Sequence, residues 1–169
     1  MSMKVYELNN KKELEVAMEF VFKNFCETEK PFYDNQEYVY ATKSLKTYDI
    51  FNLDEIEKHI FSGAVKVFAV FMDAKILAVS ALRLDGGKIL FLSMVNSDDG
   101  MGASEVLLDK MVETVKTSKD RKLSLLAFVG QEKALVSLGF MKINSSVFKF
   151  FGVKFIAMTY DYAQIDIEI

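Results

Sequence analysis

The spacing of apolar residues changes along the chain, and each change marks a new element. Short runs that are almost entirely apolar predict buried strands, whereas apolar residues at i, i+3, i+4 and i+7 predict amphipathic helices. The expected strands are Met3–Leu8, Ala64–Met72, Ile76–Leu84, Lys88–Val95, Leu123–Val129, Phe140–Phe150 and Val153–Tyr162. The expected helices run to about residue 25, over about 36–46, up to Gly63, over Met101–Lys116 and over Gln131–Leu138. This order predicts an α/β protein with a mixed sheet.

Turn and cap residues place these elements relative to one another. Asn10 with Glu13 resembles a capping box at the start of the first helix. Asp85-Gly86-Gly87 is a strong hairpin signal between two of the strands. The strand–helix–strand unit over residues 88–129 is long enough for a right-handed crossover, which predicts that its two strands are parallel.

Composition narrows the class of protein. The chain of 169 residues has 51% hydrophobic and 27% charged residues, as expected for a single globular domain over residues 1–169. A net charge of −3 gives no support to nucleic-acid binding, and no apolar run reaches the roughly 20 residues of a membrane span. One cysteine and one histidine predict no disulfide and no metal cluster. We therefore expect a cytoplasmic protein.

The stretch between the fourth strand and the next helix carries the clearest functional signal. Gly100-Met101-Gly102 lies where a buried strand is expected to turn into a helix. Unpaired amides and the positive end of the helix dipole meet at such a turn, which suits an anion such as a phosphate. A single G-x-G is also typical of an ordinary helix-entry turn, so this motif alone leaves both interpretations open.

A second candidate region is the acidic and aromatic segment that follows the first helix. Its carboxylates and ring faces are suited to attract a cationic amine, whereas the alternative is a solvated face with rings turned to the core. The residues that we single out for an acceptor pocket are Tyr33, Glu37, Tyr38 and Tyr40. Cys26 is interpreted as a buried cysteine rather than a nucleophile, because no histidine is near it in sequence.

The order of elements, with the sequences MVNSDDGMGASEVLLDKMV and ALVSLGF, resembles the GNAT-type N-acetyltransferases over nearly the whole chain. The resemblance implies a mixed sheet that splays open after its fourth strand, with acetyl-CoA in the split as acyl donor. It implies backbone contacts to the donor from Met94, Val95, Ser97, Asp99, Gly100, Met101, Gly102 and Ala103. The implied reaction is direct attack of a small-molecule or peptide amine on the thioester.

Three differences from the family pattern leave an alternative open. Ser97 stands at the usual Arg or Gln position, Asp98-Asp99 follow it in a loop that is about three residues short, and Leu135 stands where a tyrosine often acts as the acid. The sequence therefore leaves two hypotheses, an acetyltransferase whose catalytic base and acid are unassigned and a cofactor-binding module without turnover. The alternating residues 165–169 motivate a third hypothesis of a different class, a structural dimerisation protein, and with it the prediction of a homodimer.

Overall fold

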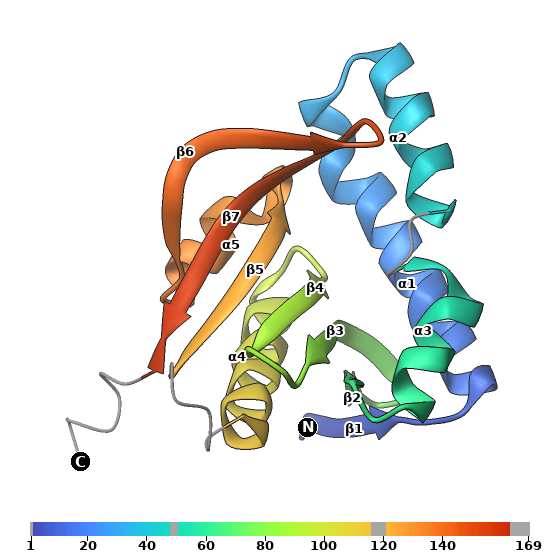
Figure 1. Cartoon of the computed structure of the whole chain (residues 1–169), viewed down its shortest axis with the longest axis vertical. Coiled ribbons are helices and arrows are strands. Elements are labelled where there is room, and N and C mark those ends of the chain that lie inside the picture. Colours follow the sequence, from blue (N-terminus) through green and yellow to red (C-terminus); the bar gives the residue numbers. More distant parts are fainter. Residues whose placement is uncertain (1, 48–50, 116–120, 163–169) are drawn as a thin grey trace.

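One mixed sheet of seven strands, in the order β1-β2-β3-β4-β5-β7-β6, forms the centre of the protein. The computed structural model describes residues 2–47, 51–115 and 121–162, so the tail at 165–169 lies outside the described residues (Figure 1). The strands are β1 Lys4–Leu8, β2 Val65–Met72, β3 Lys75–Arg83, β4 Lys88–Met94, β5 Lys122–Phe128, β6 Met141–Phe150 and β7 Val153–Asp161. The helices are α1 Lys11–Glu29, η1 Lys30–Phe32, α2 Asn35–Thr47, α3 Leu53–Phe61, α4 Asp98–Thr114, η3 Val129–Gln131 and α5 Glu132–Ser137.

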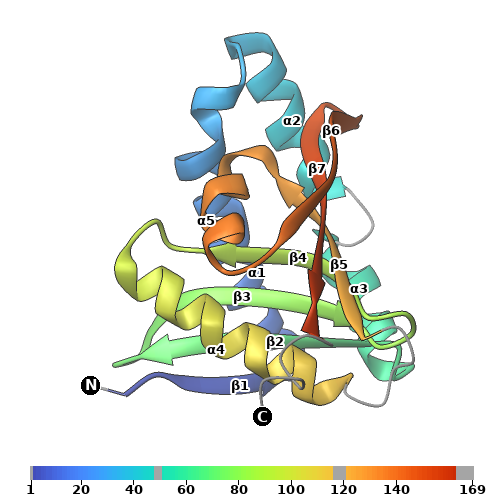
Figure 2. The same cartoon turned by 90° about the vertical axis from the view of Figure 1, so that its left-hand side faces the viewer.

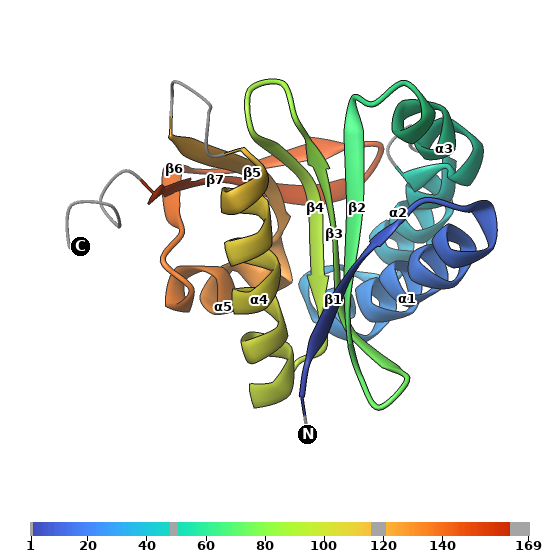
Figure 3. The same cartoon turned by 90° about the horizontal axis from the view of Figure 1, so that it is seen from below.

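Helices cover both faces of the sheet. α1, α2 and α3 lie on one side of it, and α4 and α5 lie on the other (Figure 3). The first face buries an aromatic cluster in which Phe128 contacts Phe25, Phe51 and Phe155. The second face buries an aliphatic cluster that includes Leu107 and Met111 of α4. This double cover explains why the β4 sequence is almost continuously apolar.

β4 and β5 are the strands at which the sheet changes direction. β1 to β4 pair antiparallel to their neighbours, and so do β5, β7 and β6, whereas β4 and β5 pair parallel. In Figure 2, β1 to β4 lie as a stack, and β5 and β7 run steeply away from it. The predicted parallel unit is confirmed, as is the predicted splaying of the sheet after β4.

Local signals account for most element boundaries. The Glu13 amide donates to the Asn10 side chain over 2.9 Å, which confirms the predicted cap of α1. The Asn52 side chain accepts from the amides of Asp54 and Glu55 and starts α3 in the same way. α1 continues to Glu29, about four residues beyond its predicted end, and this extension carries part of the candidate site.

Within residues 2–47, 51–115 and 121–162, no helix is both long and apolar enough to cross a bilayer. No three histidine, cysteine, aspartate or glutamate side chains of these residues converge in a way that could hold a metal ion.

Candidate functional site

The candidate site is the split between β4 and β5. The two strands pair at only two positions, Lys88 with Ser124 and Ile89 with Leu125, although both strands continue for several residues. A register shift on the β3 side of β4 leaves Leu90, the first residue past the last pair, without a partner in β3. β-bulges of this kind occur often beside active sites because they redirect the backbone. The split therefore presents unpaired strand backbone in the middle of the sheet.

The direction of each peptide group decides what the end of β4 offers to a ligand. The Val95 amide donates to the Leu77 carbonyl on β3 over 3.0 Å. The N–H and C=O groups of one strand residue point to one side, and those of the next residue point to the other. The N–H and C=O groups of Met94 therefore point toward the split. Of the two residues predicted to contact a donor at the end of β4, Met94 thus faces the split, whereas the amide of Val95, the residue after the strand, is bonded to β3.

The C-terminal part of α1 bridges the two diverging strands. At β4, the buried Asn24 side chain donates to the Met94 carbonyl and to the Ser93 hydroxyl, each over 2.8 Å. At the end of β5, the Gly130 amide donates to Glu29 Oε1 over 2.8 Å. The Thr28 hydroxyl donates to the Asn24 carbonyl and lies 3.2 Å from the second Glu29 oxygen. Residues from one turn and a half of one helix therefore contact both sides of the split.

Glu29 is the most perturbed carboxyl group of this bridge. Its side chain is completely buried. Burial raises the pKa of Glu29 from 4.5 to about 7, and the hydrogen bond from the Gly130 amide opposes the rise without cancelling it. The carboxyl group is therefore close to half ionised at neutral pH. Because both its oxygens are already engaged and neither reaches solvent, its geometry suits a positioning residue better than a base that contacts substrate.

The start of α4 differs from its predicted position. The helix begins at Asp98 and not at Met101, because the Ser97 hydroxyl accepts from the Gly100 amide over 3.2 Å and caps the helix early. Asp98 and Asp99 consequently occupy the first turn, where both are exposed and where negative charge stabilises a helix. The first-turn amides of Asp98 and Asp99 have no partner within the helix. They are the groups that this terminus offers to an anion.

The predicted glycines serve close packing at this turn. A Cβ at Gly100 would collide with the Val95 carbonyl, so the chain can turn this tightly only with glycine. A Cβ at Gly102 would lie 3.3 Å from the Met3 side chain. Met101 is half-buried and Ala103 is fully buried. Leu135, at the position of the expected acid, is also fully buried and belongs to the aliphatic core.

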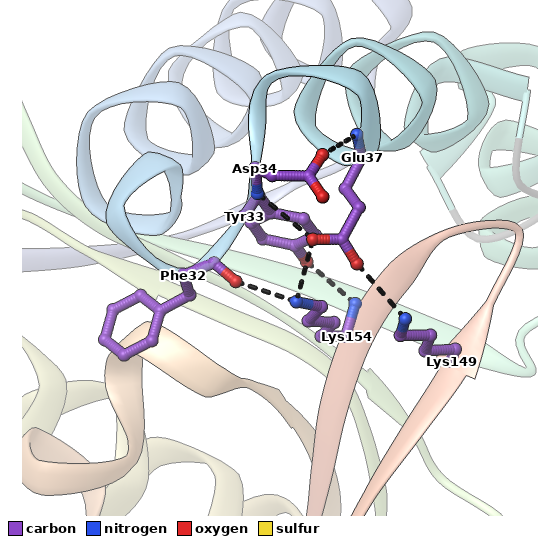
Figure 4. Close-up of polar contacts among 6 residues, drawn as sticks. All are labelled: Phe32, Tyr33, Asp34, Glu37, Lys149 and Lys154. Atoms are coloured by element: carbon purple, nitrogen blue, oxygen red, sulfur yellow. Dashed lines mark hydrogen bonds and ion pairs between the residues drawn. The ribbon is translucent and has the colours of Figure 1, made fainter.

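The predicted acceptor residues are engaged in a different contact. Glu37 forms ion pairs with Lys149 at 3.2 Å and Lys154 at 3.4 Å, on the two strands of the β6–β7 hairpin (Figure 4). Its carboxylate also accepts from the Asp34 amide, and these contacts together lower the pKa of Glu37 to about 2. The Tyr33 hydroxyl accepts from the Lys154 amide over 2.7 Å. These side chains hold the start of α2 against the hairpin.

Two other residues of the acidic and aromatic segment lie on the surface. Tyr40 is exposed and covers the hairpin turn, since a Cβ at Gly152 would collide with its ring. Tyr38 contacts Cys26, which raises the Tyr38 pKa to about 12. Cys26 itself is exposed, so the prediction of a buried cysteine is wrong. The buried stripe of α1 passes through Phe25 and Glu29, and residue 26 lies about 100° around the helix from residue 25.

Asn24 and Glu29 were not singled out from the sequence, although a signal was present. The apolar stripe of α1 includes Leu14, Met18, Val21 and Phe25, and Glu29 continues it at the next i+4 position. A carboxyl group on the buried stripe of a helix needs hydrogen-bonding partners. Extending the helix past residue 25 would therefore have identified Glu29 as a residue of interest.

Comparisons with known proteins agree with this geometry. The acetyltransferase (GNAT) domain model matches residues 28–162. A PaiA N-acetyltransferase from Thermoplasma acidophilum, solved in complex with coenzyme A, aligns with a TM-score of 0.71 at 15% identity, over 96% of this chain and 100% of its own. An acetyltransferase of the GNAT family from Staphylococcus aureus Mu50 aligns with a TM-score of 0.62 at 18% identity, over 95% and 99%. A chimeric spermidine N-acetyltransferase SpeG from Vibrio cholerae and hSSAT gives 0.55 at 15%, over 97% and 98%. No match was found among curated proteins.

Proposed function

Because the chain belongs to the GNAT acetyltransferase family, we propose that it transfers an acetyl group from acetyl-CoA to a primary amine. The observation that carries this proposal is the split itself. Pairing of β4 with β5 stops after Ile89 and Leu125, and the strands then diverge with the Met94 peptide facing the opening. In the proposed reaction, a neutral amine attacks the thioester carbon, and a C–N bond forms as the C–S bond breaks. CoA leaves as a thiolate, and the proton that the amine loses is taken up by that thiolate.

We assign the donor's pantetheine arm to the open backbone edge of β4 and its phosphates to the first turn of α4. The Met94 amide supports the first assignment, because it faces the split and because strand backbone can bond an extended amide-containing arm as it bonds another strand. The free amides of Asp98 and Asp99 support the second. The exposed carboxylates of the same two residues oppose it, and we expect them to weaken the donor's affinity.

The role that we assign to Asn24 and Glu29 is to set the width of the split. Asn24 donates to the Met94 carbonyl on β4, and Glu29 accepts from the Gly130 amide just after β5, each over 2.8 Å. These two hydrogen bonds hold the strands where backbone hydrogen bonds between β4 and β5 are missing. Loss of either bridge is expected to lower the rate of transfer more than the affinity for the donor, because the reacting groups lose their alignment.

The acceptor is an amine. One structural neighbour is a spermidine N-acetyltransferase, and an amine acceptor is what we carry over from it to this chain. Tyr33 and Glu37, the residues predicted to bind a cation, are bonded to the β6–β7 hairpin and so lend no support to a particular cationic substrate.

A thermal shift with acetyl-CoA and a thiol-release assay over an amine panel test the proposal. Donor binding at about one hundred times its Kd adds about 2.7 kcal/mol to the free energy of unfolding. We expect that stabilisation together with amine-dependent release of CoA. Pantetheine is the matched control, because it lacks the phosphates assigned to α4. If millimolar acetyl-CoA leaves the melting temperature unchanged, the assignment of the split is wrong.

The buried Leu135 favours one alternative, an acyl-CoA-binding module without turnover. A leucine at that position cannot protonate the leaving thiolate, and general acid help is typically worth about 10²–10⁴-fold. Stabilisation by acetyl-CoA without thiol release on any amine of the panel would support the module. Release of CoA with any one amine would exclude it.

A further inference from the structure

An apolar groove of about 380 Å³ opens at the point where β4 and β5 separate. Besides the last paired residues, the side chains that line it include Leu90, Ser124, Leu126, Ile143, Phe155 and Ala157. The lining is therefore aliphatic and aromatic, and it comes from four different strands. Sites for small molecules are typically concave and apolar, with a few polar groups.

Leu126 shows that this surface is unusual for the centre of a sheet. It lies on β5 between β4 and β7, yet 39% of it is exposed. Its neighbours Leu125 and Ala127, which point to the opposite face, are buried in the core that includes α4. Ala157, the register partner of Leu126 on β7, is only partly buried. An apolar surface left open in the middle of a sheet indicates an interaction site.

The groove lies on the sheet face that is suited to the acceptor. Its residues Ser124, Leu126 and Phe155 share that face with Phe128 and belong to the side covered by α1 and α2. α4, to which we assign the donor's phosphates, covers the other face (Figure 3). A direct transfer requires two substrates that meet at one carbon, so a donor entering beside α4 leaves this face for the amine.

The charge of the lining then narrows the class of amine. Among the described residues that line the groove, Lys88 is the one charged side chain, and none is a carboxylate. A polyamine would find no opposite charge there, whereas a hydrocarbon body would bury apolar surface. We infer that the acceptor of this protein is a primary amine carried on an apolar body, aliphatic or aromatic, with that body bound in the groove. The inference rests on the proposed function for its reaction and on the groove for its substrate class.

Acceptor kinetics with groove variants test the inference. Benzylamine and hexylamine serve as apolar probes, and spermidine serves as the polycation. We expect kcat/KM for the apolar amines to exceed that for spermidine by at least about tenfold, as an apolar pocket discriminates on this scale. Ala157→Phe fills the groove and should lower kcat/KM for both apolar amines by about tenfold or more, with acetyl-CoA binding unchanged.

One control variant and one substitute variant accompany Ala157→Phe. Val136→Phe places the same ring on an exposed position of α5, outside the groove, and should change neither quantity. Leu126→Gln changes polarity at an exposed position and replaces the first variant if Ala157→Phe does not fold. Preference for spermidine, or equal kinetics for wild type and Ala157→Phe, would overturn the inference while leaving the proposed acyl transfer intact.

Methyl NMR separates the two claims if no amine releases CoA. Benzylamine is titrated into the protein, with and without CoA, and the Leu126 and Ala157 methyl signals are followed. Saturable shifts of the Leu126 methyl signals that vanish in Ala157→Phe would support the apolar amine site even though the proposed transfer had failed. Absence of any shift at millimolar benzylamine would overturn the inference.

Discussion

Replacing Glu29 by glutamine is the most direct test of the bridge across the split. Glutamine has almost the shape of a protonated glutamic acid, and its side-chain oxygen can still accept the hydrogen bond from the Gly130 amide. The change therefore removes the titration of the group while keeping its volume. Any effect that depends on pH then reports the ionisation of one buried carboxyl group.

The expected size follows from the pKa of Glu29, which burial raises from 4.5 to about 7. Between these two values the folded protein holds a proton that the unfolded chain has lost, so the free energy of unfolding falls as pH rises. Each pH unit in this window is worth about 1.4 kcal/mol, so the wild type loses about 3 kcal/mol across it. The glutamine variant lacks this loss. It should be close to wild type in stability below the window and about 3 kcal/mol more stable above it.

Urea unfolding at about pH 3.5 and about pH 8.5, on either side of the window, measures the difference between variant and wild type. Taking the difference cancels the groups that titrate equally in both proteins. Glu19→Gln, on the exposed side of the same helix, is the matched control and should give the same difference at both pH values. If the Glu29→Gln difference is also independent of pH, then Glu29 is not a buried carboxyl group with a raised pKa, and our account of the bridge is wrong.

Three further changes test the turn after β4 and the contact between α2 and the hairpin. Gly100→Ala should lower the free energy of unfolding by about 1–3 kcal/mol in urea titrations, because its Cβ would collide with the Val95 carbonyl; an unchanged stability would mean a looser turn. Asp98→Asn with Asp99→Asn should tighten acetyl-CoA binding about thirtyfold by calorimetry, since each of the two charges costs roughly 1 kcal/mol near a phosphate. Unchanged affinity would place the phosphates elsewhere. Glu37→Gln should destabilise the protein at neutral pH. As pH falls from 4.5 toward about 2, wild type loses its Glu37 ion pairs, so the melting temperatures of variant and wild type should converge. A difference in melting temperature that persists at about pH 2 would contradict this account.

Local signals predicted most of the fold because local interactions decide it. The Asn10 side chain starts α1 as the sequence indicates, and the Asp85-Gly86-Gly87 turn joins two antiparallel strands. The missed boundaries have different causes. α4 starts early because of a local cap by the Ser97 side chain. The end of α1 is held by a hydrogen bond from the Gly130 amide to Glu29, about one hundred positions away, and the apolar spacing of a short window does not reveal that partner.

The candidate site, too, could be predicted from the sequence only in part. Resemblance placed Met94 at the split, and its peptide group does face that way. It could not indicate that the Val95 amide is bonded to Leu77, which depends on the register between β3 and β4. Glu37 was predicted to bind a cation, and it does pair with cationic groups. They are, however, Lys149 and Lys154 of the protein itself, which hairpin geometry brings to it.

The short pairing between β4 and β5 explains why a side-chain bridge is needed at all. A sheet that opens in its interior loses ladder hydrogen bonds on both strands, and the freed groups must be paired or remain open for a ligand. The Asn24 side chain donates to the Met94 carbonyl. The Met94 amide points in the same direction as that carbonyl and is left facing the split. Glu29 fixes the other strand through Gly130. In the proposed function, the same helix therefore limits how far the strands can separate and determines which backbone groups stay available to the donor.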